Sequence, residues 1–335
     1  MNTRILLILV VVLVAGGAAV AYLLSGIAPP PSSLTAQVFT IGVMRNPPSV
    51  DPAWIGFQDG MKARGYEVGK NLRYIVDEVG PDFPSTKKKM EALVTQQPDV
   101  LYVMGSIAAR TAKEVTGEKA PNLPIVFGVV SNPVAVGLVK SVQSPGGNMT
   151  GITPHNEVVV SKRLEVFHEM VPSVKRIVFA WSDPATSGIE NLRASVKALG
   201  LELVERRAAN QEELRAFLNT FSFRKDDGML RATDAPSGSL VKEIVRVSLE
   251  KKVPLAGTNV DDAELGALMS YGANYRKIGE QAARLVDAIV KGTKPADLPV
   301  ELPEEFEFVI NMKTAAEFGL TIPAASLIKA NRVIR

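Results

Sequence analysis

Five short segments of this sequence combine hydroxyl, amide and carboxylate side chains at points where predicted strands give way to predicted helices. Side chains of these types hydrogen-bond polar ligands, and a helix that begins there adds free N–H groups and a partial positive charge. Each segment taken alone is equally compatible with an ordinary helix cap or turn. Five of them at equivalent positions favour a shared ligand cleft. The segments are Arg45–Ser49, Gly105–Ala109, Val130–Val134, Ser182–Ser187 and Ala232–Ala235.

The motifs that would indicate catalysis are incomplete. Gly65–Asn71 is one residue short of a P-loop, lacks the Ser or Thr, and precedes a predicted strand where a P-loop follows one. His168 and Glu169 begin like a zincin motif, but the second histidine is missing and His155 is the only other histidine. Cysteine is absent altogether. We predict no enzyme, no metal site and no cofactor, although a pair of carboxylates leaves acid–base catalysis as a third alternative.

Length and composition indicate two globular lobes. At roughly 100 to 200 residues per domain, 335 residues exceed what one core usually holds. Hydrophobic residues make up 46% and charged residues 22%, as in an ordinary folded chain. The formal charge of +3 is small and its Lys and Arg residues are dispersed, so nucleic acid is not the indicated partner.

The N-terminus has the pattern of an export signal. A single cation, Arg4, precedes the uncharged stretch Ile5–Leu24, which is about long enough to cross a membrane as a helix. Ala19–Ala21 offers a cleavage site, so residues 1–37 are a signal peptide or a signal anchor followed by a Pro/Ser linker. Without cysteine no lipoprotein anchor is possible, and any membrane tether must be residues 5–24. Either alternative places the body outside the cytoplasm.

The rest of the sequence alternates apolar strand-like runs with helix-period segments, which predicts an α/β fold with parallel sheets covered by helices. Asp51 is expected to cap the first helix, with Pro52 at its first position. The expected strands are 38–44, 72–78, 100–104, 125–129, 149–152, 176–180, 202–206, 228–231 and 267–270. The expected helices are 51–64, 84–96, one that begins at 106, 158–170, 186–199, 211–221, 237–250 and 275–291.

Several stretches, in order and spanning nearly everything after the leader, resemble the ABC-transporter substrate-binding family whose better-known members bind tryptophan or tyrosine. The matching stretches are Gly105–Ala109, Pro124–Phe127, Ser131–Val139, Ser144–Gly151, Pro172–Ile177, Lys294–Val300 and Val309–Ala315. The resemblance implies the type I periplasmic-binding-protein fold, with two Rossmann-like lobes that close around a ligand by hinge rotation. The expected crossings lie near Thr153, Tyr271 and Ile310. The expected lobes are 38–153 with 272–309, and 154–271 with 310–335.

The resemblance also assigns ligand contacts. Ser106 and the N–H groups that follow it, with Ser131, would receive a carboxylate, and Asp234 would pair with an ammonium group. Thr186 and Ser187 would close on the ligand from the second lobe. The complete set of expected ligand-binding residues is Asn46, Ser106, Ile107, Ala108, Ser131, Asn132, Asp183, Thr186, Ser187, Arg231 and Asp234.

Three positions depart from the family pattern. Asn132 stands where the family usually has Asp, and Ala235–Pro236 follows Asp234 where the family has Asn-Thr. Arg231 occupies a strand position that is normally apolar. An arginine there could hold an acidic ligand, or it could face outward or be salt-bridged.

The sequence therefore predicts the extracytoplasmic solute-binding component of an ABC importer. Its partners would be a small organic ligand, an amino acid or a related carboxylate, and an ABC permease in the membrane. The chain would be periplasmic or otherwise extracytoplasmic, and possible anchoring would depend on residues 5–24. The alternative is a ligand-sensing ectodomain that reports to a membrane signalling protein.

Overall fold

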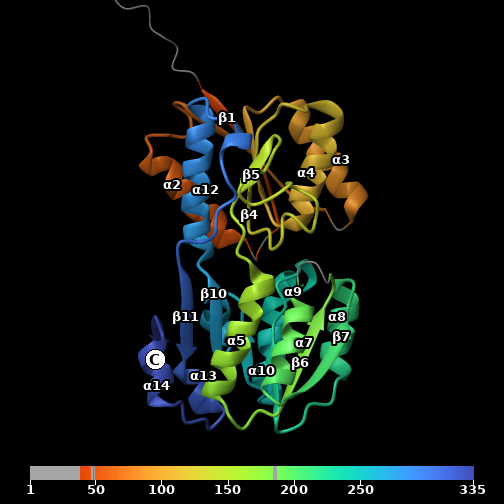
Figure 1. Cartoon of the computed structure of the whole chain (residues 1–335), viewed down its shortest axis with the longest axis vertical. Coiled ribbons are helices and arrows are strands. Elements are labelled where there is room, and N and C mark those ends of the chain that lie inside the picture. Colours follow the sequence, from red (N-terminus) through yellow and green to blue (C-terminus); the bar gives the residue numbers. More distant parts are fainter. Residues whose placement is uncertain (1–37, 47, 49, 81, 184–186) are drawn as a thin grey trace, which may run out of the picture. The chain divides into compact units, whose positions relative to one another are not determined.

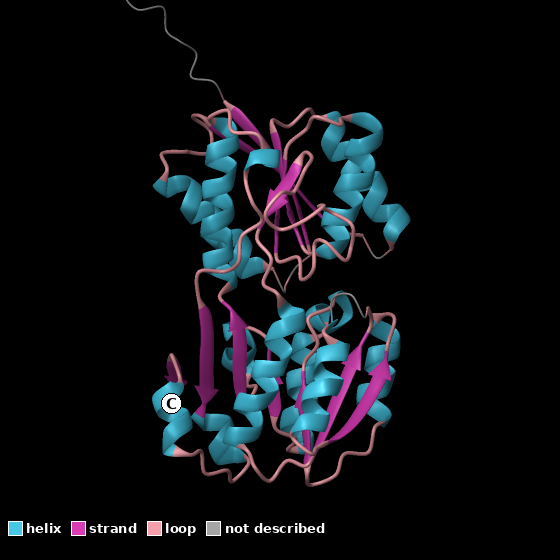
Figure 2. Ribbon diagram, viewed as in Figure 1, coloured by secondary structure: helices cyan, strands magenta, loops and turns pink. Residues whose placement is uncertain are grey.

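The strands form two sheets, and the central strands, such as Val100–Met104, are continuous apolar runs. Helices pack on the sheets (Figure 2). The computed structural model describes residues 38–46, 48, 50–80, 82–183 and 187–335. No helix in this described part of the chain is long and apolar enough to cross a membrane. The expected leader, residues 1–37 with the stretch Ile5–Leu24, lies outside the described residues.

The first sheet has five parallel strands in the order β2-β1-β3-β4-β5. The helices of this lobe are α2 (Asp51–Ala63), α3 (Phe83–Thr95), α4 (Ser106–Lys119) and α12 (Tyr275–Val290). The strands are β1 (Phe39–Arg45), β2 (Leu72–Glu78), β3 (Val100–Met104), β4 (Ile125–Gly128) and β5 (Met149–Gly151).

Strand β3 shows why this lobe has three layers. Every residue of β3 is buried, because alternate side chains of a strand point to opposite faces and both faces are covered. Tyr102 and Met104 pack in the cluster that includes α2 and α12. Leu101 and Val103 pack in the cluster that includes α3 and α4. The uninterrupted apolar run thus corresponds to a central parallel strand.

The second sheet has seven strands in the order β12-β11-β10-β9-β8-β6-β7. All of its pairs are parallel except β10 with β11. The strands are β6 (Arg176–Trp181), β7 (Glu202–Arg207), β8 (Asp227–Leu230), β9 (Leu255–Gly257), β10 (Met269–Ala273), β11 (Phe306–Asn311) and β12 (Arg332–Ile334). The helices are α5 (Asn156–Met170), α7 (Ile189–Ala198), α8 (Gln211–Thr220), α9 (Ala235–Ser239), α10 (Val241–Lys251), α11 (Val260–Leu265), α13 (Met312–Glu317) and α14 (Ala324–Lys329).

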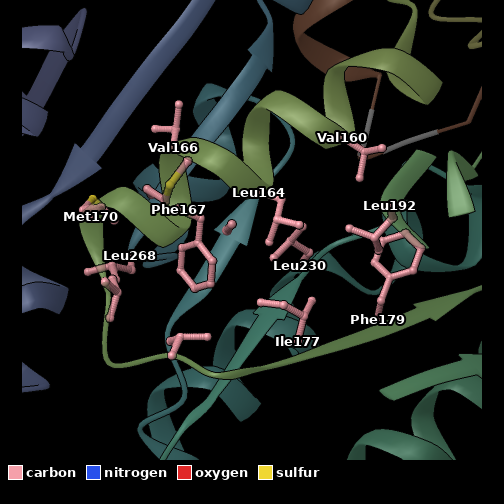
Figure 3. Packing of buried hydrophobic residues seen from close by; sticks show 14 of the residues in the cluster. Val160, Leu164, Val166, Phe167, Met170, Ile177, Phe179, Leu192, Leu230 and Leu268 are labelled. Atoms are coloured by element: carbon pink, nitrogen blue, oxygen red, sulfur yellow. The ribbon is translucent and has the colours of Figure 1, made fainter. Parts of the chain in front are cut away.

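One core cluster of this lobe lies between the sheet and helices α5 and α7. Figure 3 shows Phe167 of α5 beside Ile177 of β6, and Leu192 of α7 beside Phe179. Val178, between the two β6 residues, packs instead in the cluster on the opposite face, with α8 and α10. The alternation along β6 therefore gives this lobe the same three layers as the first.

The chain passes between the two lobes three times (Figure 1). It leaves β5 of the first sheet for α5, and leaves β10 of the second sheet for α12. The third passage precedes β11, because β11 pairs with β10 in the second sheet. Residues 306–309 therefore belong to the second sheet, whereas we expected the first lobe to extend to 309. The boundary was misplaced because β11 runs antiparallel to β10. An antiparallel strand can follow its neighbour without a crossover helix, so no helix in the sequence marks the return to the second lobe.

Two local expectations were wrong. Val50, not Asp51, is the N-cap of α2; Asp51 is its first residue, and its carboxylate pairs with Arg45 at 2.8 Å. The helix expected at 237–250 is two helices, α9 and α10, separated at Leu240. The run Ser237–Ser239 has poor helix propensity, and α9 forms around Pro236 in its first turn.

Two glycines let helices α2 and α12 pack in direct backbone contact. A Cβ placed on Gly279 of α12 would lie 2.0 Å from the carbonyl oxygen of Ala53 in α2. A Cβ on Gly56 would lie 1.9 Å from the carbonyl oxygen of Arg276. Both distances are far below van der Waals contact, so only glycine fits at either position. This contact ties α12, which follows the second crossing, to the first lobe.

We predict that Gly279→Ala destabilises the protein by about 1–3 kcal/mol, because the methyl group must push two helix backbones apart. The control is Gly117→Ala, in the exposed part of α4, where nothing lies within 4 Å of the added Cβ. That substitution should stabilise by about 0.5–1 kcal/mol through helix propensity. Denaturant unfolding measures both. Equal effects of the two variants would contradict the close packing of α2 and α12.

Candidate functional site

A cavity of about 400 Å³ lies between the two lobes, within the compact unit Phe39–Arg335. This volume is in the range of sites that hold small organic molecules. Seven of the eleven expected ligand-binding residues line it, from the ends of strands in both sheets. They are Asn46, Ser106, Ile107, Ala108, Asp183, Arg231 and Asp234.

Three other expected residues do not line this cavity. Ser131 is buried, and its carbonyl oxygen accepts a hydrogen bond from the Thr153 hydroxyl at 2.7 Å, beside the first crossing. The side-chain oxygen of Asn132 accepts from the Ala135 N–H at 3.0 Å, as in a turn. Ser187 is buried, and its hydroxyl has no hydrogen-bond partner among the residues that the structure describes. Thr186 lies outside the described residues.

The first turn of α4 contributes backbone donors to the cavity. Gly105 precedes it at a φ of 89°, where a glycine is favoured, and its N–H donates to the Gly128 carbonyl at 2.9 Å. The N–H of Ala109 makes the first helical bond, to the Gly105 carbonyl. By helix geometry the N–H groups of Ser106, Ile107 and Ala108 have no intrahelical acceptor. A fourteen-residue helix thus presents its positive end to the cavity, which suits an anionic group.

Asp234 is an anion in the opposite wall, but it also has a structural role. It is only 6% exposed. One carboxylate oxygen accepts from the Ser237 N–H at 3.1 Å and caps α9, and the other accepts from the Ser182 N–H at 2.7 Å. These two bonds join the loop after β6 to the start of α9. Each oxygen keeps a lone pair, so the carboxylate can also face a cation in the cavity.

Arg231 lines the cavity and also forms a salt bridge. The sequence had left a position near the ligand and a salt bridge as separate alternatives for this side chain. Its Nε donates to the Asp262 carboxylate at 2.8 Å, and both side chains are almost fully buried. Its other nitrogens donate to the Thr258 hydroxyl and, at 3.3 Å, to the Ala232 carbonyl. The charge of Arg231 is therefore neutralised inside the protein, and three of its five N–H donors are already engaged.

Sequence reasoning missed two arginines that line the same cavity. Arg110 lies one turn beyond Ser106 on α4, and Arg207 is the last residue of β7. The Arg207 guanidinium lies 5.9 Å from the centre of the Trp181 ring. Arg110 could have been found from helical spacing, because residues four apart share a helix face. Arg207 could have been found from its place at the end of a strand, but β7 was expected to stop at 206.

A buried arginine lies behind this wall of the cavity. Arg163 of α5 is 1% exposed, and its Nε donates to the Tyr271 carbonyl at 2.8 Å. One terminal nitrogen, Nη2, is buried and has no hydrogen-bond partner in the described part of the chain. Burial, and then the neighbouring charge of Arg231, lower the pKa of Arg163 to about 10. The side chain therefore remains cationic at neutral pH. Tyr271, whose carbonyl it binds, belongs to β10, the strand that leads into the second crossing.

A second cavity, of about 300 Å³, shares Arg231 with the first. Asp51 lines it from the first lobe, and Asp261, Asp262 and Glu264 line it from the second. Burial, and then the charges of Glu264 and Asp262, raise the pKa of Asp261 to about 6. Nowhere in the described ranges do three or more His, Cys, Asp or Glu residues form a group that could hold a metal ion.

Comparisons with known proteins agree with this architecture. A tyrosine-binding protein of Clostridioides difficile (strain R20291) is 27% identical over 285 residues, 84% of this chain and 81% of that protein. The crystal structure of a conserved domain protein from Vibrio cholerae is 29% identical with a TM-score of 0.80. An ABC domain from Streptococcus pneumoniae in complex with L-Trp is 25% identical with a TM-score of 0.81. Each structure covers 89% of this chain and is itself covered completely.

The chain belongs to the ABC transporter substrate binding protein family, whose match spans residues 39–334. Its two-lobed α/β architecture is that of type I periplasmic binding proteins, as predicted. Members of this family bind substrates outside the cytoplasm and are not enzymes, which confirms that part of the prediction.

We predict that Asp261→Asn stabilises the protein at pH 8 and has little effect at pH 4. A carboxyl whose pKa is higher in the folded state than its usual 3.8 binds its proton more tightly there. Folding stability therefore falls as the pH rises from about 4 through 6, and the amide removes that loss. Since the side chain is partly exposed, the gain at pH 8 is about 1 kcal/mol.

Thermal melts of both proteins at pH 4 and pH 8 measure this difference. The exposed Asp297, in the short turn Pro295–Asp297, supplies the control Asp297→Asn. That variant should shift the melting temperature equally at the two pH values. An Asp261→Asn shift that is also equal at both would contradict the raised pKa.

Proposed function

We propose that this protein is the extracytoplasmic solute-binding component of an ABC importer and that it binds an amino acid or a related small carboxylate between its lobes. The observation that carries the proposal is the 400 Å³ cavity, which the donor end of α4 lines from one lobe and Asp234 lines from the other. A zwitterion has the matching pair of charges. The family membership and the amino-acid ligands of the two relatives named above support this class of ligand.

The proposed contacts place the ligand carboxylate on the N–H groups of Ser106, Ile107 and Ala108, and the ligand ammonium beside Asp234. Asn46 and Asp183 contribute further polar groups from the two lobes. Ser131, Asn132 and Ser187, which do not line the cavity as described, would join the site on closure. Closure would rotate the lobes about the three crossings and exclude water from the ligand. The closed form would then be the one that an ABC permease recognises.

Export of the chain is part of the same proposal. Residues 1–37 would direct it across the cytoplasmic membrane, and Ile5–Leu24 would hold it there if this stretch is retained. Fractionation of the native cells should find the protein outside the cytoplasm, and the mass of its N-terminus distinguishes a removed signal peptide from a retained anchor. Recovery of the full-length chain from the cytoplasm alone would contradict export.

We predict ligand-dependent thermal stabilisation without turnover. A screen of amino acids and small carboxylates, tryptophan and tyrosine included, should find compounds that stabilise the protein by RT ln(1 + [L]/Kd), about 2.7 kcal/mol at 100 times Kd. The same compounds should reduce the radius of gyration in solution scattering, since closure compacts the lobes. A screen in which none of these compounds stabilises the protein would refute this class of ligand.

Two variants of Ser106 test the role of the α4 N-terminus. Ser106→Pro deletes the first free N–H at a helix position that tolerates proline, and it should weaken binding of the compounds found by about 10- to 100-fold. Ser106→Ala keeps the N–H and removes only the hydroxyl, so its effect should be smaller. Equal affinities for the two variants would contradict a carboxylate on these backbone donors.

A further inference from the structure

We infer that the ligand of this cavity carries a second anionic group, and that Arg110 and Arg207 bind it from opposite lobes. The ligand class is then a small dicarboxylate, an amino acid with an acidic side chain above all. This inference rests on the proposed function, because it extends the same site from a zwitterion to a ligand with one more negative charge.

The protein already pairs most of the charges that line the cavity. Five charged side chains line the cavity, three arginines and two aspartates. Arg231 is matched by the buried carboxylate of Asp262. Asp234 holds two backbone N–H groups and faces the expected ammonium, and Asp183 has an interaction of its own. Arg110 and Arg207 remain.

Neither of these two arginines has a hydrogen-bond or ion-pair partner for its guanidinium among the described residues. Among the other exposed arginines, Arg193 pairs with Glu205 at 2.9 Å and Arg246 with Glu250 at 2.6 Å, whereas Arg73 and Arg206 pair with none of the described carboxylates. Arg110 and Arg207 differ from these last two because they line the cavity. The Arg207 guanidinium lies over the Trp181 ring, 5.9 Å from its centre. Stacking leaves the planar donors of a guanidinium free at its edge, where a carboxylate binds in a bidentate manner.

The charged groups that line the cavity indicate the class of ligand. The donor end of α4 accounts for one carboxylate and Asp234 for one ammonium group, which is the complete charge complement of a neutral amino acid. Such a ligand would leave two guanidinium groups unpaired when closure excludes water, and desolvation of unpaired charges is costly. A second carboxylate removes this cost through charge-assisted hydrogen bonds.

The test compares acidic amino acids with their neutral counterparts. Calorimetric titration of the full chain with glutamate and 2-aminoadipate, against glutamine, tryptophan and tyrosine, should give tighter binding of at least one acidic compound by about 10-fold or more. Arg110→Gln and Arg207→Gln should each weaken binding of that compound by about 10- to 100-fold and leave the affinity for neutral amino acids unchanged.

The matched control is Arg206→Gln. Arg206 is the exposed neighbour of Arg207 on β7, its side chain points to the other face of the sheet, and it does not line the cavity. This variant should bind every compound as the unaltered protein does. A thermal melt without ligand verifies that each variant is folded.

The outcomes separate the two proposals. If neutral amino acids bind and acidic ones do not, the second anionic group is refuted and the amino-acid-binding function stands. If the two arginine variants lose neutral and acidic ligands alike, these arginines bind the common carboxylate and the inference is also refuted. If no compound of either kind binds, the proposed function fails and the inference fails with it.

Discussion

The buried contact between Arg231 and Asp262 is the interaction on which both cavities of the protein depend. It joins the end of β8 to α11 across 31 residues, and Thr258, at the end of β9, hydrogen-bonds both members of the pair. Loss of one member of such a pair typically costs about 3–5 kcal/mol, because the other is left charged and buried. Asp262 thereby fixes Arg231 in the wall between the two cavities, and it prevents this arginine from serving as a freely adjustable ligand group.

Hydrophobic burial explains why the polar loops meet near this contact. Strands β3 and β6 alternate their side chains between two helical layers, so each sheet is covered on both faces and only its strand ends are open. In parallel sheets all the carboxyl ends lie along the same edge. The topology therefore brings the segments after β1, β3, β6, β7 and β8 to the cavity, and the hydrogen bond from the Ser182 N–H to Asp234 joins two of them.

Periodicity and the strand-end rule were sufficient to predict most strands, the parallel character of the sheets and the segments that hold six of the cavity-lining residues, whereas the family resemblance singled out Arg231. What they could not predict depends on contacts between distant residues. Asp51 looks like an N-cap locally, but Arg45 at the end of β1 takes its carboxylate. The boundary near 310 was wrong because β11 is an antiparallel return strand, which has no periodic signal that distinguishes it from a parallel one. The sequence alone left several environments open for Arg231, because its partner, Asp262, lies on another element.

The position of Arg163 bears on how a ligand could be coupled to closure. Arg163 donates to the carbonyl of Tyr271 in β10, the strand that leads into the second crossing, and it also interacts with Arg231 in the cavity wall. An anion bound in the proposed site would attract both arginines, and this attraction would be largest with water excluded, because the effective dielectric constant then falls. The proposed ligand would then favour closed lobes over open ones, which is the difference in affinity that a ligand needs to drive closure.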